Sequence, residues 1–113
     1  MTIARGDVLR VALDPTLGSK IKKARPCVVV QRASANQTSP LIIVCPLTDA
    51  AGRAGNALNI PIERGIGGTT KDSVVRVNQI RSVDKSRVLK HLGALPGTVM
   101  QRVDAGLRLI LDL

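Results

Sequence analysis

The residues best suited to chemistry lie in one short stretch, where a basic segment runs directly into an apolar run. Lys20, Lys22, Lys23 and Arg25 are followed by Pro26 and then by Cys-Val-Val-Val. Proline disfavours helix for the residue before it and cannot donate a ladder hydrogen bond, so we expect a loop that ends where a buried strand begins. Arg25 would stand at the mouth of that strand, where a guanidinium can grip a phosphate as a planar fork. The lysines would steer the phosphate toward it.

The charge of the whole chain indicates the same kind of ligand. Its 113 residues include 17 Lys+Arg against 8 Asp+Glu, a formal net charge of +9. Such an excess favours a polyanionic partner, nucleic acid first and an anionic membrane surface second, with non-specific stickiness as the remaining alternative. The chain has no Phe, Tyr or Trp. Bases therefore cannot stack on aromatic rings, and nucleic-acid contacts must come from arginine planes, hydrogen bonds and phosphate pairing.

Composition also argues against several classes of protein. Cys27 and Cys45 both lie inside apolar runs, which favours buried small hydrophobes over a disulfide. A metal site would need more ligands than one histidine without a Cys-x-x-Cys pattern supplies, so we expect no metal and no cofactor. No apolar run approaches the ~20 residues that span a bilayer, and the first residues contain no apolar signal core. We expect a cytoplasmic protein with no membrane contact and a single domain over residues 1–113.

Up to about residue 83 the hydrophobic pattern predicts mostly strands, joined by a polar connection at 33–39 and a flexible loop at 49–56. Pro46 should end or bend the third strand, and Pro61 should place the fourth at a sheet edge or at a bulge. The predicted strands are residues 8–13, 26–31, 41–45, 57–62 and 73–83.

The glycine-rich segment at residues 65–70, Gly-Ile-Gly-Gly-Thr-Thr, has two possible interpretations. A phosphate-binding loop would need Gly-Lys-Ser/Thr at the Walker spacing and a helix behind it, and neither follows. A turn between two strands is therefore favoured over a phosphate-binding loop.

The longest predicted strand, residues 73–83, alternates in polarity. Val75 and Val77 would face the core, and Arg76, Asn78 and Arg81 would share the opposite face. That second face is equally consistent with a nucleic-acid contact and with a solvated strand surface.

Two helices are predicted to close the chain. Asp84 is a good N-cap for a helix over residues 85–92, and Thr98 opens a capping box before a second helix over residues 99–111. His91 would lie in the last turn of the first helix, where an imidazolium complements the helix dipole; this role is favoured over catalysis.

Six blocks of residues carry a family resemblance. In chain order they are Arg5-Gly-Asp-Val, Leu13-Asp-Pro-Thr-Leu-Gly18, Lys23-Ala-Arg-Pro-Cys-Val-Val-Val30, Cys45-Pro-Leu-Thr48, Asp72-Ser-Val-Val-Arg-Val-Asn-Gln-Ile-Arg81 and Val83-Asp-Lys-Ser-Arg87. Together they resemble the MazF/PemK family of toxin endoribonucleases over nearly the whole chain. The resemblance implies a mainly β fold with a few helices, an SH3-like β-barrel of the plasmid-maintenance toxin / cell growth inhibitor type with a C-terminal helix.

The resemblance also implies an activity and partners. The activity is metal-independent cleavage of single-stranded RNA, mRNA in particular, at a short sequence, leaving a 2′,3′-cyclic phosphate and a 5′-hydroxyl. The partners are a second copy of the chain, in a homodimer, and a cognate antitoxin whose acidic, flexible tail occupies the RNA groove. The alternatives are a non-catalytic SH3-like nucleic-acid-binding module and a gyrase-poison toxin of the same fold.

The family's catalytic pair falls on Arg25 and Thr48. Arg25 can neutralise charge on the phosphorane oxygens and Thr48 can orient one of them, although spacing alone is equally consistent with Thr48 as a turn residue. Some family members carry a His and an Asp where this chain has Ser19 and Asn78. Asparagine cannot act as a general base, and an arginine with a pKa above ~12 is a poor one. The sequence therefore offers no obvious general base.

The remaining expected RNA contacts are basic or amide side chains of the two loops and the long strand. The lysines are expected to steer phosphates without fixed geometry, and the glutamine to contact a base edge or hold a loop. These residues are Lys20, Lys22, Lys23, Arg53, Arg76, Asn78, Gln79 and Arg81.

Overall fold

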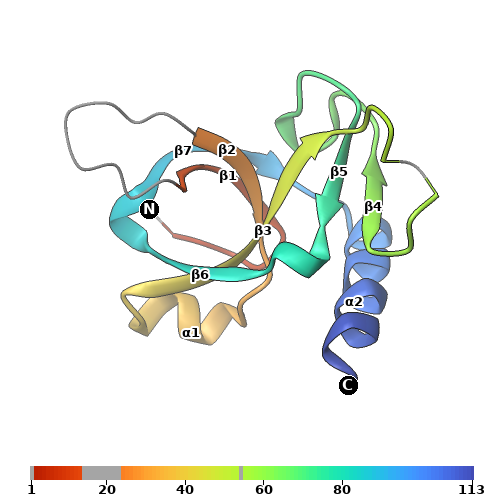
Figure 1. The fold of residues 1–113 in the computed structure, drawn as a ribbon. Helices are drawn as coiled ribbons and strands as arrows, with labels where there is room; N and C mark the ends of the chain where they lie inside the picture. The colour runs from red at the N-terminus through yellow and green to blue at the C-terminus, as the bar shows by residue number, and fades with distance from the viewer. Residues whose placement is uncertain (1, 14–23, 54) are drawn as a thin grey trace.

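The computed structural model describes residues 2–13, 24–53 and 55–113, and these form a mainly β fold with a C-terminal helix (Figure 1). The strands are β1 (Asp7–Ala12), β2 (Ala24–Val29), β3 (Leu41–Asp49), β4 (Asn59–Ile62), β5 (Ser73–Arg76), β6 (Arg81–Asp84) and β7 (Val88–Ala94). The helices are α1 (Ala33–Thr38) and α2 (Gly97–Leu111), and single 3₁₀ turns are η1 (Ile66–Gly68), η2 (Val77–Gln79) and η3 (Lys85–Arg87).

The strands pair antiparallel in the order β4-β5-β3-β2-β1-β7, with β6 pairing the first half of β3. The sheet curls strongly, as in a barrel (Figure 1), but no pairing among the described residues joins β4 to β7 to close it. The predicted mainly β architecture with an SH3-like barrel and a C-terminal helix is confirmed in this open form. β4 is an edge strand, as Pro61 predicted.

Strand β3 extends past Pro46, beyond the predicted residues 41–45, so Pro46 does not end it. It continues to Asp49 and changes partners on the way: Leu41 to Val44 pair with β6, and the pairing with β5 begins at Leu47. Pro46, which has no N–H to donate, lies between the two ladders. The proline is tolerated inside the strand because it falls where no hydrogen bond to β5 or β6 is required.

The prediction of a single strand at residues 73–83 is wrong, because β3 pairs with two separate parts of this segment. Val75 pairs with Leu47 and Arg81 pairs with Val44. The two pairs are six residues apart on this segment but only three residues apart on β3. The turn η2 absorbs the extra residues. Val75 and Val77 are nevertheless buried as predicted.

The helix predicted at residues 85–92 is also wrong. The Asp84 carboxylate does cap a turn, accepting a hydrogen bond from the Ser86 N–H at 2.8 Å, but the turn is only η3. The chain then becomes β7, because backbone pairing with β1 satisfies more groups than one further helical turn. His91 therefore lies on a strand, with Nε2 3.5 Å from Asp7 Oδ1, and has no helix end to complement.

Two local predictions about helices fail as well. The polar connection at 33–39 contains α1, where the Asn36 side chain accepts from Gln31 Nε2 and donates to the Gln31 carbonyl, closing the turn. Thr98 does not cap α2, because the helix begins earlier, with the Val99 and Met100 N–H groups donating to the Pro96 carbonyl. Thr98 is thus inside the first turn.

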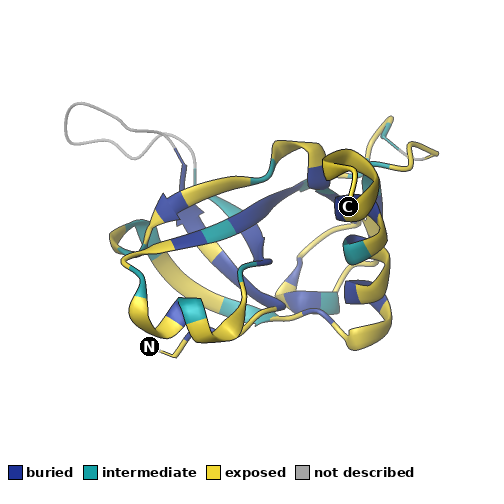
Figure 2. Cartoon of the chain, turned by 90° about the horizontal axis from the view of Figure 1, so that it is seen from below, coloured by how far each residue is buried: buried dark blue, intermediate teal, exposed yellow. Residues whose placement is uncertain are grey.

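The central strands are buried on both faces (Figure 2). One face packs under α2, against Val99, Val103 and Leu107, and the other forms a second apolar cluster inside the curl of the sheet. Neighbouring residues of one strand alternate between the clusters: Val8 belongs to the first and Leu9 to the second. The uninterrupted apolar runs in the sequence follow from this two-sided burial.

The two cysteines are buried and free, as predicted. Cys27 belongs to the inner cluster and Cys45 to the cluster under α2, so their side chains lie on opposite faces of the sheet. Burial raises the pKa of each thiol to about 12. Both act as small apolar side chains.

The glycine-rich segment is a turn between β4 and β5, as predicted, and it packs tightly against β7. Gly68 has φ +76°, and a Cβ at this position would lie 2.2 Å from the Leu92 carbonyl oxygen. Gly93 approaches the same turn from the other side, so that a Cβ there would lie 2.8 Å from the Gly67 carbonyl carbon. These contacts fix the start of the segment that leads to Thr69 and Lys71.

We expect Gly68→Ala to lower the free energy of unfolding by more than about 3 kcal/mol, the range of severe backbone and packing defects. Gly52→Ala is the matched control, because Gly52 has φ +71° but a Cβ added there would meet no atom of the described residues within 4 Å. In the control, the free energy of unfolding should fall by only about 1–2 kcal/mol, the cost of placing alanine in the left-handed backbone conformation. Urea unfolding of the variants gives the comparison, and equal losses would contradict the close contact with β7.

Candidate functional site

Two cavities open side by side at the second half of β3, and both are lined by Arg25 and Thr48. The first, which we call the lysine cavity, has a volume of about 620 Å³ and is also lined by Asp49 and Lys71. The second, the arginine cavity, has a volume of about 400 Å³. Arg25 and Thr48 thus stand at the junction of the two cavities.

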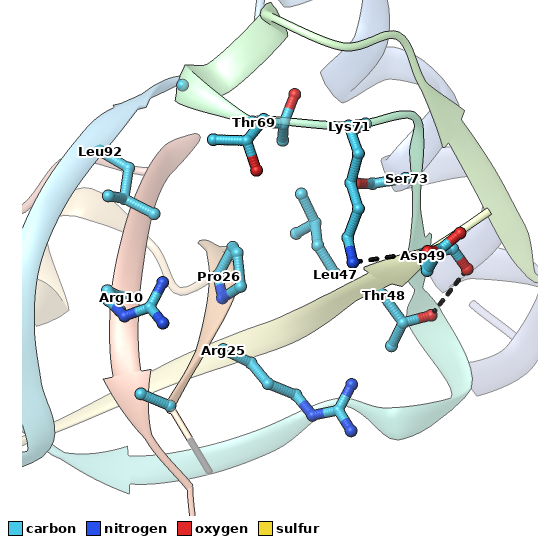
Figure 3. Close-up of a pocket in the computed structure, with 13 residues that line it drawn as sticks. Arg10, Arg25, Pro26, Leu47, Thr48, Asp49, Thr69, Lys71, Ser73 and Leu92 are labelled. Atoms are coloured by element: carbon cyan, nitrogen blue, oxygen red, sulfur yellow. Dashed lines mark hydrogen bonds and ion pairs between the residues drawn. The ribbon is translucent and has the colours of Figure 1, made fainter.

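The register of the sheet explains why these two residues meet. Cys27 on β2 pairs with Pro46 on β3 in an antiparallel ladder. The ladder ends at that pair, and two residues beyond it on each strand lie Arg25 and Thr48, which line both cavities. Arg25 is held on its other side by pairing with Val11 of β1, as the second residue of β2 and not in a loop before it. Figure 3 shows its guanidinium extending toward the strand that carries Thr48.

The arginine cavity concentrates positive charge. Its charged side chains are Arg25, Arg53, Arg76 and Arg81, and none of the described residues that line it is acidic. Like charges gathered in this way repel one another and lower stability unless an anion enters. Such a cavity is suited to a phosphate.

The arginines of this cavity are held in different ways. Arg53 donates from Nη1 to the carbonyls of Asp49 and Ala51, at 3.0 and 3.1 Å. Arg76 is half-buried, and its Nε is enclosed without a hydrogen-bond partner among the described residues. A buried donor without a partner is costly, and in native proteins it often marks the place of an absent ligand or water.

The lysine cavity is more mixed in character. Lys71 Nζ lies 3.4 Å from Asp49 Oδ2, and the Thr48 hydroxyl donates to the Asp49 carbonyl at 3.4 Å (Figure 3). The Ala51 N–H, which bonds Asp49 Oδ1 at 2.9 Å, and then Lys71 hold the pKa of the Asp49 carboxyl below its usual value. Asp49 is therefore an ionised group beside Thr48.

The structure brings most of the predicted site residues together. Arg53, Arg76, Gln79 and Arg81 join Arg25 and Thr48 around the arginine cavity. Asn78 is exposed on η2 and lines neither cavity. Ser19 and the approach-loop lysines lie outside the described residues; those lysines are Lys20, Lys22 and Lys23.

Sequence reasoning missed three charged residues that line the lysine cavity: Arg10, Asp49 and Lys71. Lys71 follows the glycine-rich segment, whose pattern predicts only a turn, and Asp49 falls at the start of a predicted loop. Lys71 and Asp49 are neighbours in space because Asp49 pairs with Ser73 at the end of the β3–β5 ladder. The only signal in the sequence was polarity, namely the Thr-Thr-Lys run after the glycines and the acidic residue next to Thr48.

The fold and site define a class of protein, a small barrel-like domain whose curled antiparallel sheet gathers arginines around two joined cavities suited to a polyanionic ligand. Comparison with known proteins gives the family. Residues 4–111 match the family described as PemK-like, MazF-like toxin of type II toxin-antitoxin system. The chain is 37% identical over 111 residues to Endoribonuclease MazF of Staphylococcus epidermidis, covering 98% of this chain and 92% of that protein. The chain therefore belongs to the PemK/MazF family of toxins.

Solved structures agree with this fold. MazF of Deinococcus radiodurans superposes with a TM-score of 0.81 at 24% identity, covering 100% of this chain and 99% of that one. Mycobacterium tuberculosis toxin MazF-mt6 gives a TM-score of 0.79 at 19% identity, with 95% and 97% of the two chains covered. At these identities the likeness concerns the fold.

The arginine cavity predicts stabilisation by inorganic phosphate. A ligand that binds only the folded state at about 100 times its Kd adds about 2.7 kcal/mol, so phosphate should raise the Tm. Arg76→Met should reduce this rise, and in low salt without phosphate the variant should unfold at a higher temperature than the parent, because one repelling charge is gone.

Arg102→Met provides the control for net charge, since Arg102 is exposed on α2 and lines neither cavity. It should keep the full phosphate effect in the same calorimetric scans. An equal rise for Arg76→Met and the parent would show that phosphate binds elsewhere.

Proposed function

We propose that this protein is a toxin endoribonuclease that cleaves single-stranded RNA, chiefly mRNA, at a short sequence and without a metal ion, leaving 2′,3′-cyclic phosphate and 5′-hydroxyl ends. The observation that carries the proposal is the meeting of Arg25 and Thr48, 23 positions apart in the sequence, at the junction of two cationic cavities. The name of the 37% identical relative, Endoribonuclease MazF, supports the same activity.

The proposed chemistry is attack of a ribose 2′-hydroxyl on its own 3′-phosphate. Negative charge grows on the phosphorane oxygens in the transition state, and a guanidinium placed there stabilises it with two parallel hydrogen bonds. Arg25 supplies that charge and Thr48 supplies one hydroxyl to orient an oxygen. Both are half-buried on paired strands, so little reorganisation is needed when RNA binds.

The arginine cavity would hold phosphates next to the cleaved one. Arg53, Arg76 and Arg81 pair with phosphate oxygens in this proposal, and Gln79 contacts a base edge, because an amide both donates and accepts. Asn78 meets RNA at the exposed rim of η2. The RNA contacts proposed for the approach loop are Lys20, Lys22 and Lys23, which steer phosphates inward.

Two partners belong to the proposal. MazE–MazF structures are known from Deinococcus radiodurans, and an endoribonuclease from a mycobacterial species has been solved with its cognate antitoxin. We infer that this chain is neutralised in the same way, by a cognate antitoxin whose acidic, flexible tail covers the basic cavities. We also infer a homodimer, since several large apolar side chains are exposed, among them Leu89, Leu109 and Leu111.

We place this toxin in the cytoplasm, where its mRNA substrate is found. None of the helices in the described ranges is long and apolar enough to cross a membrane.

The test is incubation with a mixed single-stranded RNA in EDTA. The parent should make discrete cuts with cyclic phosphate ends, and Arg25→Ala and Thr48→Val should each slow cleavage by ~100 to 1000-fold, as for loss of one oxyanion-stabilising donor. Arg102→Ala, on the exposed side of α2, should cut like the parent. If Arg25→Ala cuts RNA as fast as the parent, the proposed mechanism is wrong. If the parent cuts no RNA, a non-catalytic binding module is favoured.

A further inference from the structure

The proposed cleavage needs two proton transfers that Arg25 and Thr48 do not readily provide. The 2′-hydroxyl must lose a proton as it attacks, and the 5′-oxygen must gain one as it leaves. An arginine side chain keeps its proton in proteins, and a threonine hydroxyl is far too weak an acid or base to exchange one freely at neutral pH. Other side chains must serve as acid and base.

The charged residues around the two cavities leave few choices. Among the described residues, those that line the cavities and carry a charge are five arginines, one carboxylate and one amine. Only the carboxylate of Asp49 and the amine of Lys71 can gain or lose a proton during a reaction. The arginines are Arg10, Arg25, Arg53, Arg76 and Arg81.

Asp49 and Lys71 are also in the right place. Asp49 follows Thr48 directly on β3, and its carboxylate is anchored by the Ala51 N–H. Lys71 comes from the segment before β5, and its side chain extends across the lysine cavity toward Asp49 (Figure 3). Nζ and Oδ2 lie 3.4 Å apart, close enough to exchange a proton after a small movement.

A purely structural role explains this ion pair poorly. The side chains of Lys71 and Asp49 are 64% and 51% exposed, and ion pairs this open to solvent add little stability. The pair is also open to competition, since a phosphate entering the lysine cavity offers Lys71 a second anion. A carboxylate in a cavity that admits phosphate repels the ligand, which is a cost that catalysis would justify.

We propose that Asp49 and Lys71 are the proton-transfer residues of the cleavage reaction, acting beside Arg25 and Thr48; the inference rests on the proposed function. Asp49 removes the 2′-hydroxyl proton as the bond from O2′ to phosphorus forms. The bond from phosphorus to O5′ breaks, and the Lys71 ammonium gives O5′ a proton. The carboxylic acid and the amine that result exchange one proton across their contact, which restores the starting ion pair.

The surrounding charges fit this division of roles. Asp49 is faced by Lys71 and by Arg53, whose guanidinium bonds its carbonyl; Arg10 and Arg25 complete the wall from β1 and β2. When Lys71 turns to the bound phosphate, the carboxylate loses a cation and gains a nearby anion. Both changes raise the pKa of Asp49 and make it a stronger base at the moment of reaction.

The experiment measures single-turnover cleavage of one RNA whose cut site has been mapped with the parent protein. Asp49→Asn and Lys71→Met should each slow cleavage by ~100-fold or more, as for loss of general acid or base catalysis. Affinity for the same RNA with a 2′-deoxyribose at the cut site should stay within a few-fold of the parent. Lys71→Arg, which keeps the charge but not the exchangeable proton, should stay slow.

A second substrate separates the two roles. In an RNA with sulfur in place of the bridging O5′, the leaving thiolate needs no proton. Lys71→Met should recover close to the parent rate on this RNA, whereas Asp49→Asn should stay slow. Glu63→Gln and Arg102→Met are the charge-matched controls, exposed and outside both cavities, and should cut both substrates like the parent.

Each outcome decides something. If the parent cuts and Asp49→Asn and Lys71→Met cut equally well, the inference is wrong while the proposed function stands. If Lys71→Arg keeps the parent rate, or sulfur fails to rescue Lys71→Met, Lys71 acts through charge alone and the acid assignment is wrong. If the parent leaves every RNA intact, the proposed function itself fails, and the inference with it.

Discussion

The site depends on one constraint, the register in which β2 pairs with β3. The ladder ends at Cys27 opposite Pro46, two residues before Arg25 and Thr48, and a shift of one residue would turn each side chain to the other face of its strand. The register is strongly specified because both faces of these strands are buried: Val28 and Cys45 pack under α2, while Val29 and Val44 pack inside the curl. Packing in the core therefore determines the geometry of the candidate site.

Strand β3 has a second property on which the site depends. Its first half pairs with β6 and its second half with β5, and Pro46 lies at the change. The change carries Arg76 and Gln79 to the arginine cavity, because η2 occupies the space between β5 and β6. It also ends the β5 ladder at Asp49 and Ser73, which brings Asp49 near Lys71. The stability of the sheet offsets the repulsion among the arginines, as is usual for binding sites built on rigid scaffolds.

The amino-acid sequence predicts those parts of the fold that local pattern determines. Apolar runs indicate β1 and β2, Pro61 marks the exposed edge correctly, and the Arg-Pro step marks the start of β2, where Arg25 lines both cavities. Prediction fails where a distant partner decides the outcome. Residues 88–94 form a strand because β1 is available to pair with them, and the break after Arg76 exists because the segment from β5 to β6 is longer than the part of β3 that it must match.

The candidate site, like the fold, can be predicted from the sequence only in part. Arg53, Arg76, Gln79 and Arg81 are recognisable as polar residues near predicted strands, but nothing in the sequence shows that they share one cavity with Arg25. Asp49 and Lys71 escape prediction because each belongs to a polar segment that looks like an ordinary turn, and 22 positions separate them in the sequence. The fold alone places them 3.4 Å apart.

In the proposed reaction, the reacting phosphate lies at the junction of the two cavities. A crystal structure of the protein with a short RNA that carries a 2′-deoxyribose at the cut site tests it most directly. We expect the phosphate following this sugar to contact the Arg25 guanidinium and the Thr48 hydroxyl, with a neighbouring phosphate among Arg53, Arg76 and Arg81. An RNA bound across α2 or β7, with both cavities free of phosphate, would contradict it.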